Sequence, residues 1–468
     1  MTSMQAASAA NRFGLGARPG DWQVIGSDPR GWLQTQLQPA PLPAALAELP
    51  DSRATLDAFH ALRMQRGQAR GAATDPALLA AKKAAQREAR QALQRELVVR
   101  QGVAVGCDDG FRERLVRFWS NHFAISVDKG RAAPFAGPME REAIRPRLCG
   151  RFVDLLLAVT RHPGMLVYLD NVQSIGADSR LGVASRRRAG RQPGASARGL
   201  NENLAREIME LHTLGVEGGY TQGDVVEFAR AITGWGLAAP QAPGREVFAF
   251  RAAAHQPGAR QVLHRRFGQE GEQQGVAILH MLAVHPATAR HVSLQLARHF
   301  IADAPPPTLV QRMAKAWLDS EGHLPTVYRA MLDDDAAWQP DARKFKTPDD
   351  FCVSALRACG LSGQDVLAMA VRLQAQLGQP VFQPRSPAGF GDVAADWGGP
   401  DALFKRVQAA QAIAERLPDS QGITPLALGG MALGSGLDAQ TAAALRRAES
   451  VQQGVALLLA SPAFQWRS

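Results

Sequence analysis

The sequence predicts an all-α protein: a large multi-helix body with two long loops rich in Gly, Pro and Arg, and little or no sheet. Apolar residues recur at helical spacing along most of the 468 residues. We find no run of alternating apolar and polar residues typical of a strand, and no repeat at the period of a solenoid. The composition, 46% hydrophobic and 21% charged, is that of an ordinary globular chain and excludes general disorder.

The longest expected helix covers residues 78–105, which contain no Gly or Pro before Gly102 and are rich in strong helix formers. A second helix is expected to begin at Thr221, since Asp224 three positions later completes a capping box. Other helices are expected at 111–123, 151–160, 201–215, 272–300, 308–318 and 324–333 and within the last 65 residues.

Loops and domain boundaries complete this prediction. Residues 172–199 and 376–400 are expected to be long loops, and 248–258 could hold one short hairpin strand. The divisions we expect are an N-terminal helical segment (1–75), a helical core that carries the polar signature (76–345) and a C-terminal helical segment packed on it (346–468).

The net charge of +10 is carried mostly by Arg. A base-composition bias of the genome explains an Arg-, Ala- and Gly-rich chain by itself, whereas a basic surface for nucleic acid, anionic polysaccharide or another polyanion is the alternative. The four cysteines form no Cys-x-x-Cys pair, which argues against a thiolate zinc site, and Cys352 and Cys359 are expected to be buried.

The sequence also bears on location. Residues 1–16 lack a basic n-region and an apolar h-region, so we expect no signal peptide and a cytoplasmic protein. Export together with a partner is the alternative. No stretch approaches the roughly 18 apolar residues of a membrane span.

The segment 201–215, NENLAREIMELHTLG, concentrates polar residues on one expected helix. At 100° per residue, Asn203, Glu207 and Glu210 lie within about 60° of one another, with Arg206 beside them. His212 points about 130–160° away from both carboxylates, so the three cannot ligate one ion in a regular helix. Two interpretations of these polar residues remain open: a catalytic face, and the salt-bridged stripe of an ordinary surface helix.

Other candidates come from three short motifs. Asn121 and His122 end the helix 111–123, and Asp170 and Asn171 follow the sequence Tyr-Leu in a turn. Arg198 ends the Arg-rich stretch just before the segment 201–215, where a helix N-terminus favours anions. Patterns typical of serine hydrolases, nucleotide-binding loops, dinucleotide-binding folds and zinc proteases are absent.

Several of these segments together resemble the bacterial domain of unknown function 1800 family. They are NRFGLGARPGD (11–21), RFWSNHF (117–123), YLDN (168–171), the block 201–235 and LLLASPAFQWR (457–467). The resemblance implies that their polar residues converge on one site, and it implies no particular reaction. It also implies a partner, a phosphatase- or sulfatase-like secreted protein of the domain of unknown function 1501 family.

Two positions depart from the pattern of that family. His255-Gln256 stands where the family tends to have His-Asp with a nearby Lys, and Gly389-Phe390 where it tends to have Gly-Trp. These departures put the C-terminal half of the implied site in doubt.

Our leading hypothesis is a hydrolase-like enzyme that acts on an anionic or sugar-containing substrate. Its catalytic residues would be Glu207, Glu210, His122 and His212, with one glutamate as the general base and His122 as the general acid. Substrate contacts would come from Arg206, Asn203, Asn121, Asn171 and Arg198. A divalent cation held by Asp170, Glu207 and Glu210 is a compatible variant.

Two other classes of function remain as alternatives. One is a non-catalytic partner or assembly factor for the phosphatase-like protein, in which the stripe of charges is structural. The other is non-specific binding of a polyanion through the Arg-rich loop. Nucleic acid is the less favoured partner, because the loop has no interleaved aromatic residues for base stacking.

Overall fold

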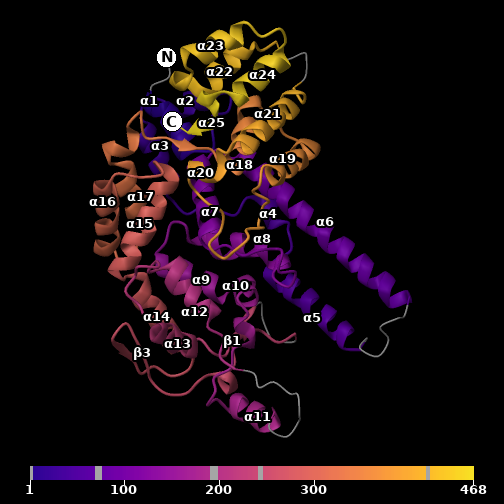
Figure 1. Ribbon diagram of the computed structural model, residues 1–468, viewed down its shortest axis with the longest axis vertical. Helices are drawn as coiled ribbons and strands as arrows, with labels where there is room; N and C mark the ends of the chain where they lie inside the picture. Colours follow the sequence, from indigo (N-terminus) through magenta and orange to yellow (C-terminus); the bar gives the residue numbers. More distant parts are fainter. Residues whose placement is uncertain (1–3, 69–75, 190–198, 241–245, 418–421, 468) are drawn as a thin grey trace.

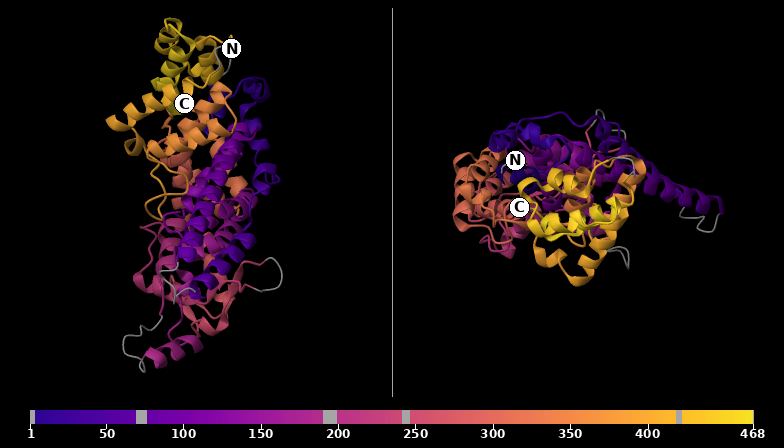
Figure 2. Two further views of the ribbon diagram at one scale, coloured as in Figure 1. Left: turned by 90° about the vertical axis from the view of Figure 1, so that its right-hand side faces the viewer. Right: turned by 90° about the horizontal axis from the view of Figure 1, so that it is seen from above.

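The computed structural model describes residues 4–68, 76–189, 199–240, 246–417 and 422–467. The molecule is elongated, with both chain ends at one end and helix α11 at the other (Figures 1 and 2). Helices dominate, as the sequence predicts. None of the helices in these ranges is long and apolar enough to cross a membrane.

The N-terminal third contains several short helices and three long ones. The helices α5 and α6 project from the body as an arm (Figure 1). The α-helices here are α1 (Met4–Ser8), α2 (Asp21–Ile25), α3 (Pro29–Thr35), α4 (Ala44–Ala47), α5 (Ser52–Gln68), α6 (Pro76–Gly106), α7 (Gly110–His122) and α8 (Ala136–Pro138).

The central third carries the polar signature. Its helices are α9 (Phe152–Arg161), α10 (Pro163–Tyr168), α11 (Arg180–Ala189), α12 (Asn203–Glu207), α13 (Gln222–Ala231), α14 (Glu272–Ala283), α15 (Pro286–Phe300), α16 (Pro307–Asp319) and α17 (Leu324–Leu332). The capping box predicted at Thr221 is confirmed, since its hydroxyl accepts from the Asp224 amide and the Asp224 carboxylate accepts from the Thr221 amide.

The C-terminal third is helical as expected. It contains α18 (Pro348–Cys359), α19 (Gln364–Gln376), α20 (Ala394–Trp397), α21 (Pro400–Ala414), α22 (Pro425–Leu433), α23 (Ala439–Arg446), α24 (Val451–Ala460) and α25 (Pro462–Gln465). Cys352 and Cys359 are buried in α18, as predicted, and neither forms a disulfide. The loop expected at 376–400 is present except for the single turn of α20.

Two predictions of local structure were wrong. Residues 180–189 form α11, although we expected the whole of 172–199 to be a loop. Residues 272–300 form two helices, because the ring of Pro286 begins a new helix and the side chain of His285 caps it by accepting from the Ala287 amide.

Three small antiparallel ribbons join the helices. Strand β1 (Trp235–Leu237) pairs with β2 (Phe248–Phe250), β3 (Arg260–Val262) with β4 (Arg265–Phe267), and β5 (Lys344–Phe345) with β6 (Trp466–Arg467). The hairpin strand expected at 248–258 corresponds to β2. The pairing of β5 with β6 fixes the end of the chain against the segment that precedes α18.

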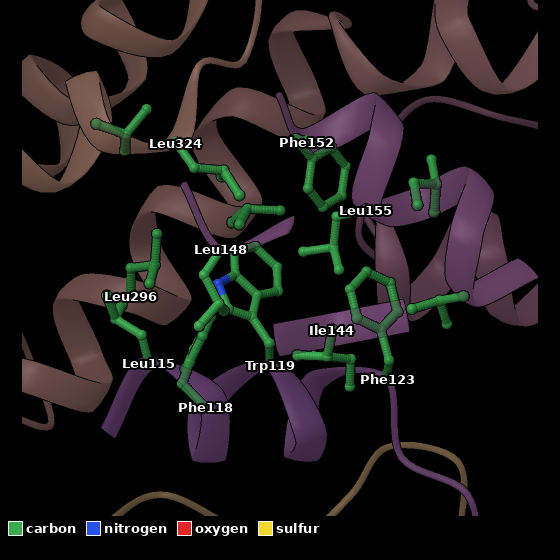
Figure 3. Close-up of a cluster of buried hydrophobic side chains, with 14 of the residues drawn as sticks. Leu115, Phe118, Trp119, Phe123, Ile144, Leu148, Phe152, Leu155, Leu296 and Leu324 are labelled. Carbon is green, nitrogen blue, oxygen red and sulfur yellow. The ribbon is translucent and has the colours of Figure 1, made fainter. Parts of the chain in front are cut away.

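The hydrophobic side chains form two main clusters. The larger joins residues from Ala6 to Trp338, and Figure 3 shows its centre, where Trp119 of α7 packs among Phe123, Phe152 and Leu155. The second lies in the C-terminal third, between Phe351 and Phe464, and takes in Leu15, Ala104 and Val105. Since α7 belongs to the larger cluster, burial of Trp119 and Phe123 holds its last residue, His122, in the interior.

Candidate functional site

The segment 201–215 is helical, but it is not one regular α-helix. The α-helix α12 covers Asn203–Glu207, and the next turn, η7, is a π-helix over Ile208–His212. A π-turn contains more residues than an α-turn and is often found at functional sites. The face that we assigned at 100° per residue therefore holds for α12 and does not extend to Glu210 or His212.

Glu207 and Glu210 lie close together at the junction of α12 and η7. Both side chains are partly exposed, and neither forms a hydrogen bond or an ion pair with any residue in the described ranges. Burial, followed by the charge of Glu210, raises the pKa of Glu207, and Arg206 opposes this rise. These two carboxylates repel one another, and no cation in the described ranges forms an ion pair with either of them, an arrangement also found in catalytic carboxyl pairs.

Two tyrosines that we had not selected flank this pair. Burial and the charge of Glu207 raise the pKa of Tyr168, and burial and the charge of Glu210 raise that of Tyr220. Both phenols are therefore protonated at neutral pH and can donate hydrogen bonds. Tyr168 begins the segment YLDN and Tyr220 directly precedes the capping residue Thr221, so their nearness to the predicted site was the only signal in the sequence.

The cations near the carboxylate pair are already paired. Arg206 donates to Glu202 at 2.8 Å and to Gln222 at 2.9 Å. Lys129 donates to Asp170 at 2.6 Å and to the carbonyl oxygen of Tyr168 at 2.6 Å. An anionic substrate would have to displace one of these pairs.

The structure does not group Asp170 with Glu207 and Glu210, the three ligands expected for a cation. Asp170 has a left-handed backbone, with φ 58°, and is held by Lys129 and Gln173. Within the described ranges no three His, Cys, Asp or Glu side chains are grouped so as to hold a metal ion. Two neighbouring glutamates in the sequence were not sufficient to predict a cation site. The expected third ligand, Asp170, is paired with the ammonium group of Lys129 instead.

His122 and His212 do not fit the acid–base roles that we expected. His122 is buried, its Nδ1 lies 2.8 Å from Gln295 Oε1 and its Nε2 lies 3.2 Å from the carbonyl oxygen of His212. Burial lowers the pKa of His122 to about 4 and that of His212 well below its usual range. Burial thus favours the neutral form of both rings at pH 7, which argues against His122 as the general acid.

The imidazole rings instead support the π-turn. The last carbonyl groups of a helix lack partners within it. His122 lies against the carbonyl of His212, and His291 Nε2 lies 3.2 Å from the carbonyl oxygen of Leu211. The Gln295 side chain lies between the two rings, with its Oε1 2.8 Å from His122 Nδ1 and its Nε2 2.9 Å from His291 Nε2. Both His291 and Gln295 are on α15 and were missed, because only the tertiary structure brings α15 to this turn.

The asparagines expected to bind substrate contact the backbone instead. Asn121 donates to the carbonyl of Phe390 and accepts from its amide, which fixes the loop after α19. Asn171 is fully buried and donates to the carbonyls of Ile232 and Trp235. The Asn203 side chain is exposed. Arg198 lies outside the described residues.

A serine–histidine pair occurs elsewhere. Ser52 Oγ lies 2.8 Å from His162 Nε2, and both side chains are buried. The Gly164 amide donates to His162 Nδ1 at 3.1 Å, so that nitrogen is unprotonated and the proton of the neutral ring is on Nε2. His162 therefore donates to Ser52 and cannot remove its proton, which excludes a nucleophilic serine of the usual kind.

The fold and the site thus define a class: a helical protein with a partly exposed carboxylate pair, flanked by tyrosines and supported by buried histidines. The chain belongs to a family whose model, described as protein of unknown function (DUF1800), matches residues 8–466. This confirms the resemblance seen in the sequence. No curated protein and no solved structure matches the chain.

Proposed function

We propose that this protein is a hydrolase-like enzyme in which Glu207 is the general base. The observation that carries the proposal is the unpartnered pair of Glu207 and Glu210, in which burial and like charge raise the pKa of Glu207. A base whose pKa rises toward neutrality accepts a proton more effectively in the transition state. A purely structural carboxylate in the described part of the chain would be expected to have a cationic or hydrogen-bonding partner.

The substrate that we propose is sugar-containing and uncharged where it meets Glu207. Sugar hydroxyl groups offer donors to the two carboxylates and acceptors for the phenols of Tyr168 and Tyr220. Arg206 and Lys129 are already paired with Glu202 and Asp170, which supports an uncharged group over an anionic one. Glu207 would take a proton from a water molecule as the water oxygen bonds to the anomeric carbon, and the departing sugar oxygen would take up a proton from Tyr168 or Tyr220 as its bond to that carbon breaks. The charge of Glu210 would raise the basicity of Glu207.

The test is turnover of a substrate panel that covers nitrophenyl glycosides, carboxylic esters, phosphate esters and sulfate esters. We expect glycoside turnover that Glu207→Gln lowers by at least about 100-fold, the usual contribution of a general base. The matched control is Glu217→Gln, which removes an exposed carboxylate just after the same helical segment. Unchanged turnover in Glu207→Gln, or no turnover of any class, contradicts the proposal.

A second candidate function, that of a non-catalytic partner, is favoured by one observation. Leu403, Phe404 and Val407 lie on one face of α21 and are 42%, 63% and 43% exposed. Exposed apolar patches often mark sites of protein contact. Titration of a phosphatase- or sulfatase-like protein of the domain of unknown function 1501 family should then give binding that Phe404→Ser weakens. An affinity that Phe404→Ser leaves unchanged would contradict this function.

A further inference from the structure

Helix α11 is a basic surface at the end of the molecule furthest from the chain termini (Figures 1 and 2). It contains four arginines and no acidic residue in ten positions. At 100° per residue, Arg180, Ala184, Arg187 and Arg188 lie within about 100° of one another, opposite Gly182. The structure agrees, because these four residues are exposed and Gly182 is buried.

The N-terminal end of α11 is fixed to the body. The Ser179 hydroxyl accepts from the Gly182 amide at 3.0 Å and donates to the Gly176 carbonyl at 2.7 Å. A Cβ atom on Gly182 would lie only 2.1 Å from that same carbonyl oxygen, so the contact requires glycine. Gln256 accepts from the Asp178 amide and donates to its carboxylate. The arginines are therefore presented on an anchored helix.

Three of these arginines have no partner among the residues that the structure describes. Asp178 lies 3.7 Å from Arg186, which also donates to the Ala177 carbonyl. Arg180, Arg187 and Arg188 form no hydrogen bond or ion pair with any residue in the described ranges. Exposed guanidinium groups that lack an intramolecular partner in these ranges are available to an anionic partner, and a guanidinium can bind phosphate oxygens in a bidentate manner.

We propose that the exposed face of α11 binds the phosphate backbone of double-stranded nucleic acid without reading its sequence. Arg180 is separated from Arg187 and Arg188 by about 10.5–12 Å along the helix axis, close to the major-groove width of about 12 Å. Ala184 between them leaves room for close approach. The absence of aromatic residues from α11 argues against single strands and leaves a backbone-bound duplex.

This proposal is independent of the one for Glu207 and reverses our preference among polyanions. That preference rested on the absence of aromatic residues for base stacking, which counts against single strands but not against a duplex bound through its phosphates. A membrane surface is disfavoured, since Leu181 is the one large apolar residue exposed on this helix.

The test compares two triple variants of the full chain for binding to a labelled DNA duplex of about 20 base pairs. One is Arg180→Gln/Arg187→Gln/Arg188→Gln on α11. The matched control, Lys83→Gln/Arg87→Gln/Arg90→Gln, removes the same charge from α6, where these three side chains are exposed and likewise unpartnered within the described ranges.

Three phosphate contacts predict that log Kd changes with log salt with a slope of about 2.7, so the affinity falls about 40-fold between 50 and 200 mM salt. We expect the slope of log Kd against log salt to be much smaller for the α11 variant than for the wild type, and unchanged for the α6 variant. Equal weakening in both variants, a flat salt dependence, or binding of a sulfated polysaccharide in preference to the duplex would each overturn the proposal.

Discussion

Arginine residues in the interior explain part of the unusual composition of this protein. Nine arginines are buried among the described residues, and most of these pair with a carboxylate or a backbone carbonyl group. Arg114, for example, donates to Asp350 at 2.5 Å and to the Gly14 carbonyl at 2.6 Å. A surplus of arginine in the sequence is therefore not, by itself, a measure of basic surface.

The carboxylate pair allows a prediction at the scale of single residues. Glu210→Gln removes the like charge beside Glu207, so the pKa of Glu207 should fall toward the usual value for glutamate. Carboxyl carbon NMR over a pH titration measures this shift. As a control, Arg206→Gln should raise the pKa of Glu207. If Glu210→Gln leaves the pKa of Glu207 unchanged, the two carboxylates do not interact.

His122 predicts how stability depends on pH. Its pKa is lowered to about 4 in the folded protein, from an ordinary value of 6.5. Between these values the unfolded chain binds a proton that the folded chain does not, so stability falls as the pH drops from 6.5 to about 4. The full effect is about 3 kcal/mol.

Urea unfolding at several pH values tests this prediction. His122→Gln should have a shallower decline of stability between pH 6.5 and 4 than the wild type, whatever its stability at pH 7. An equal decline in the two proteins would show that His122 is not the group that titrates.

At the scale of elements, the π-turn η7 is the feature that organises the site. It places Glu210 near Glu207 and presents the carbonyls of Leu211 and His212 to imidazole rings of α15 and α7. Gly215 closes the turn with φ 82°, as expected for a glycine after a helix end. A Cβ atom there would lie 2.7 Å from His291 Nδ1.

Gly215→Ala should therefore destabilise the protein for two reasons, a strained backbone and a clash with His291. The left-handed backbone alone costs about 1–2 kcal/mol for a non-glycine residue. Gly219 offers a matched control, since it has φ 80° and a Cβ atom there would have no neighbouring atom within 4 Å. We expect a larger loss of unfolding free energy in Gly215→Ala than in Gly219→Ala, and equal losses would argue against the packing of His291 on this turn.

At the scale of the whole molecule, a buried polar network joins the two hydrophobic clusters. Arg467, in the last strand, is fully buried between Asp350 of α18 and the carbonyl of His299 at the end of α15. Asp350 also forms an ion pair with Arg114 of α7. The charges of Arg114 and Arg467 hold the pKa of Asp350 well below its usual range. The final residues of the chain thus connect helices from all three thirds of the sequence.

Arg467→Gln should destabilise the protein by about 3–5 kcal/mol, because it leaves buried groups without their charged partner. Thermal or urea unfolding measures this loss. Arg312→Gln is the control, since the Arg312 side chain is 63% exposed in its pair with Asp334 and should contribute at most about 1 kcal/mol. A loss as small as that of the control would show that the network does not join the two clusters.

The fold class and most of the helices could be predicted from the sequence, since helical periodicity and capping boxes are local properties. The capping box at Thr221, the burial of Cys352 and Cys359, and the pairing of Glu207 with Glu210 all depend on residues a few positions apart. The family was also recognisable, because its motifs lie in continuous segments.

Contacts between distant segments determined the features of the site that could not be predicted from the sequence. Whether Asp170 is a free ligand depends on Lys129, and whether His122 is a proton donor depends on its burial beside α15. The anchoring of α11 depends on Gln256, which lies far from it along the chain, beyond β2. Charge state and backbone geometry are set by the surrounding atoms, so the sequence determined which residues are present near the site, and only the tertiary structure determined which of them are free to react.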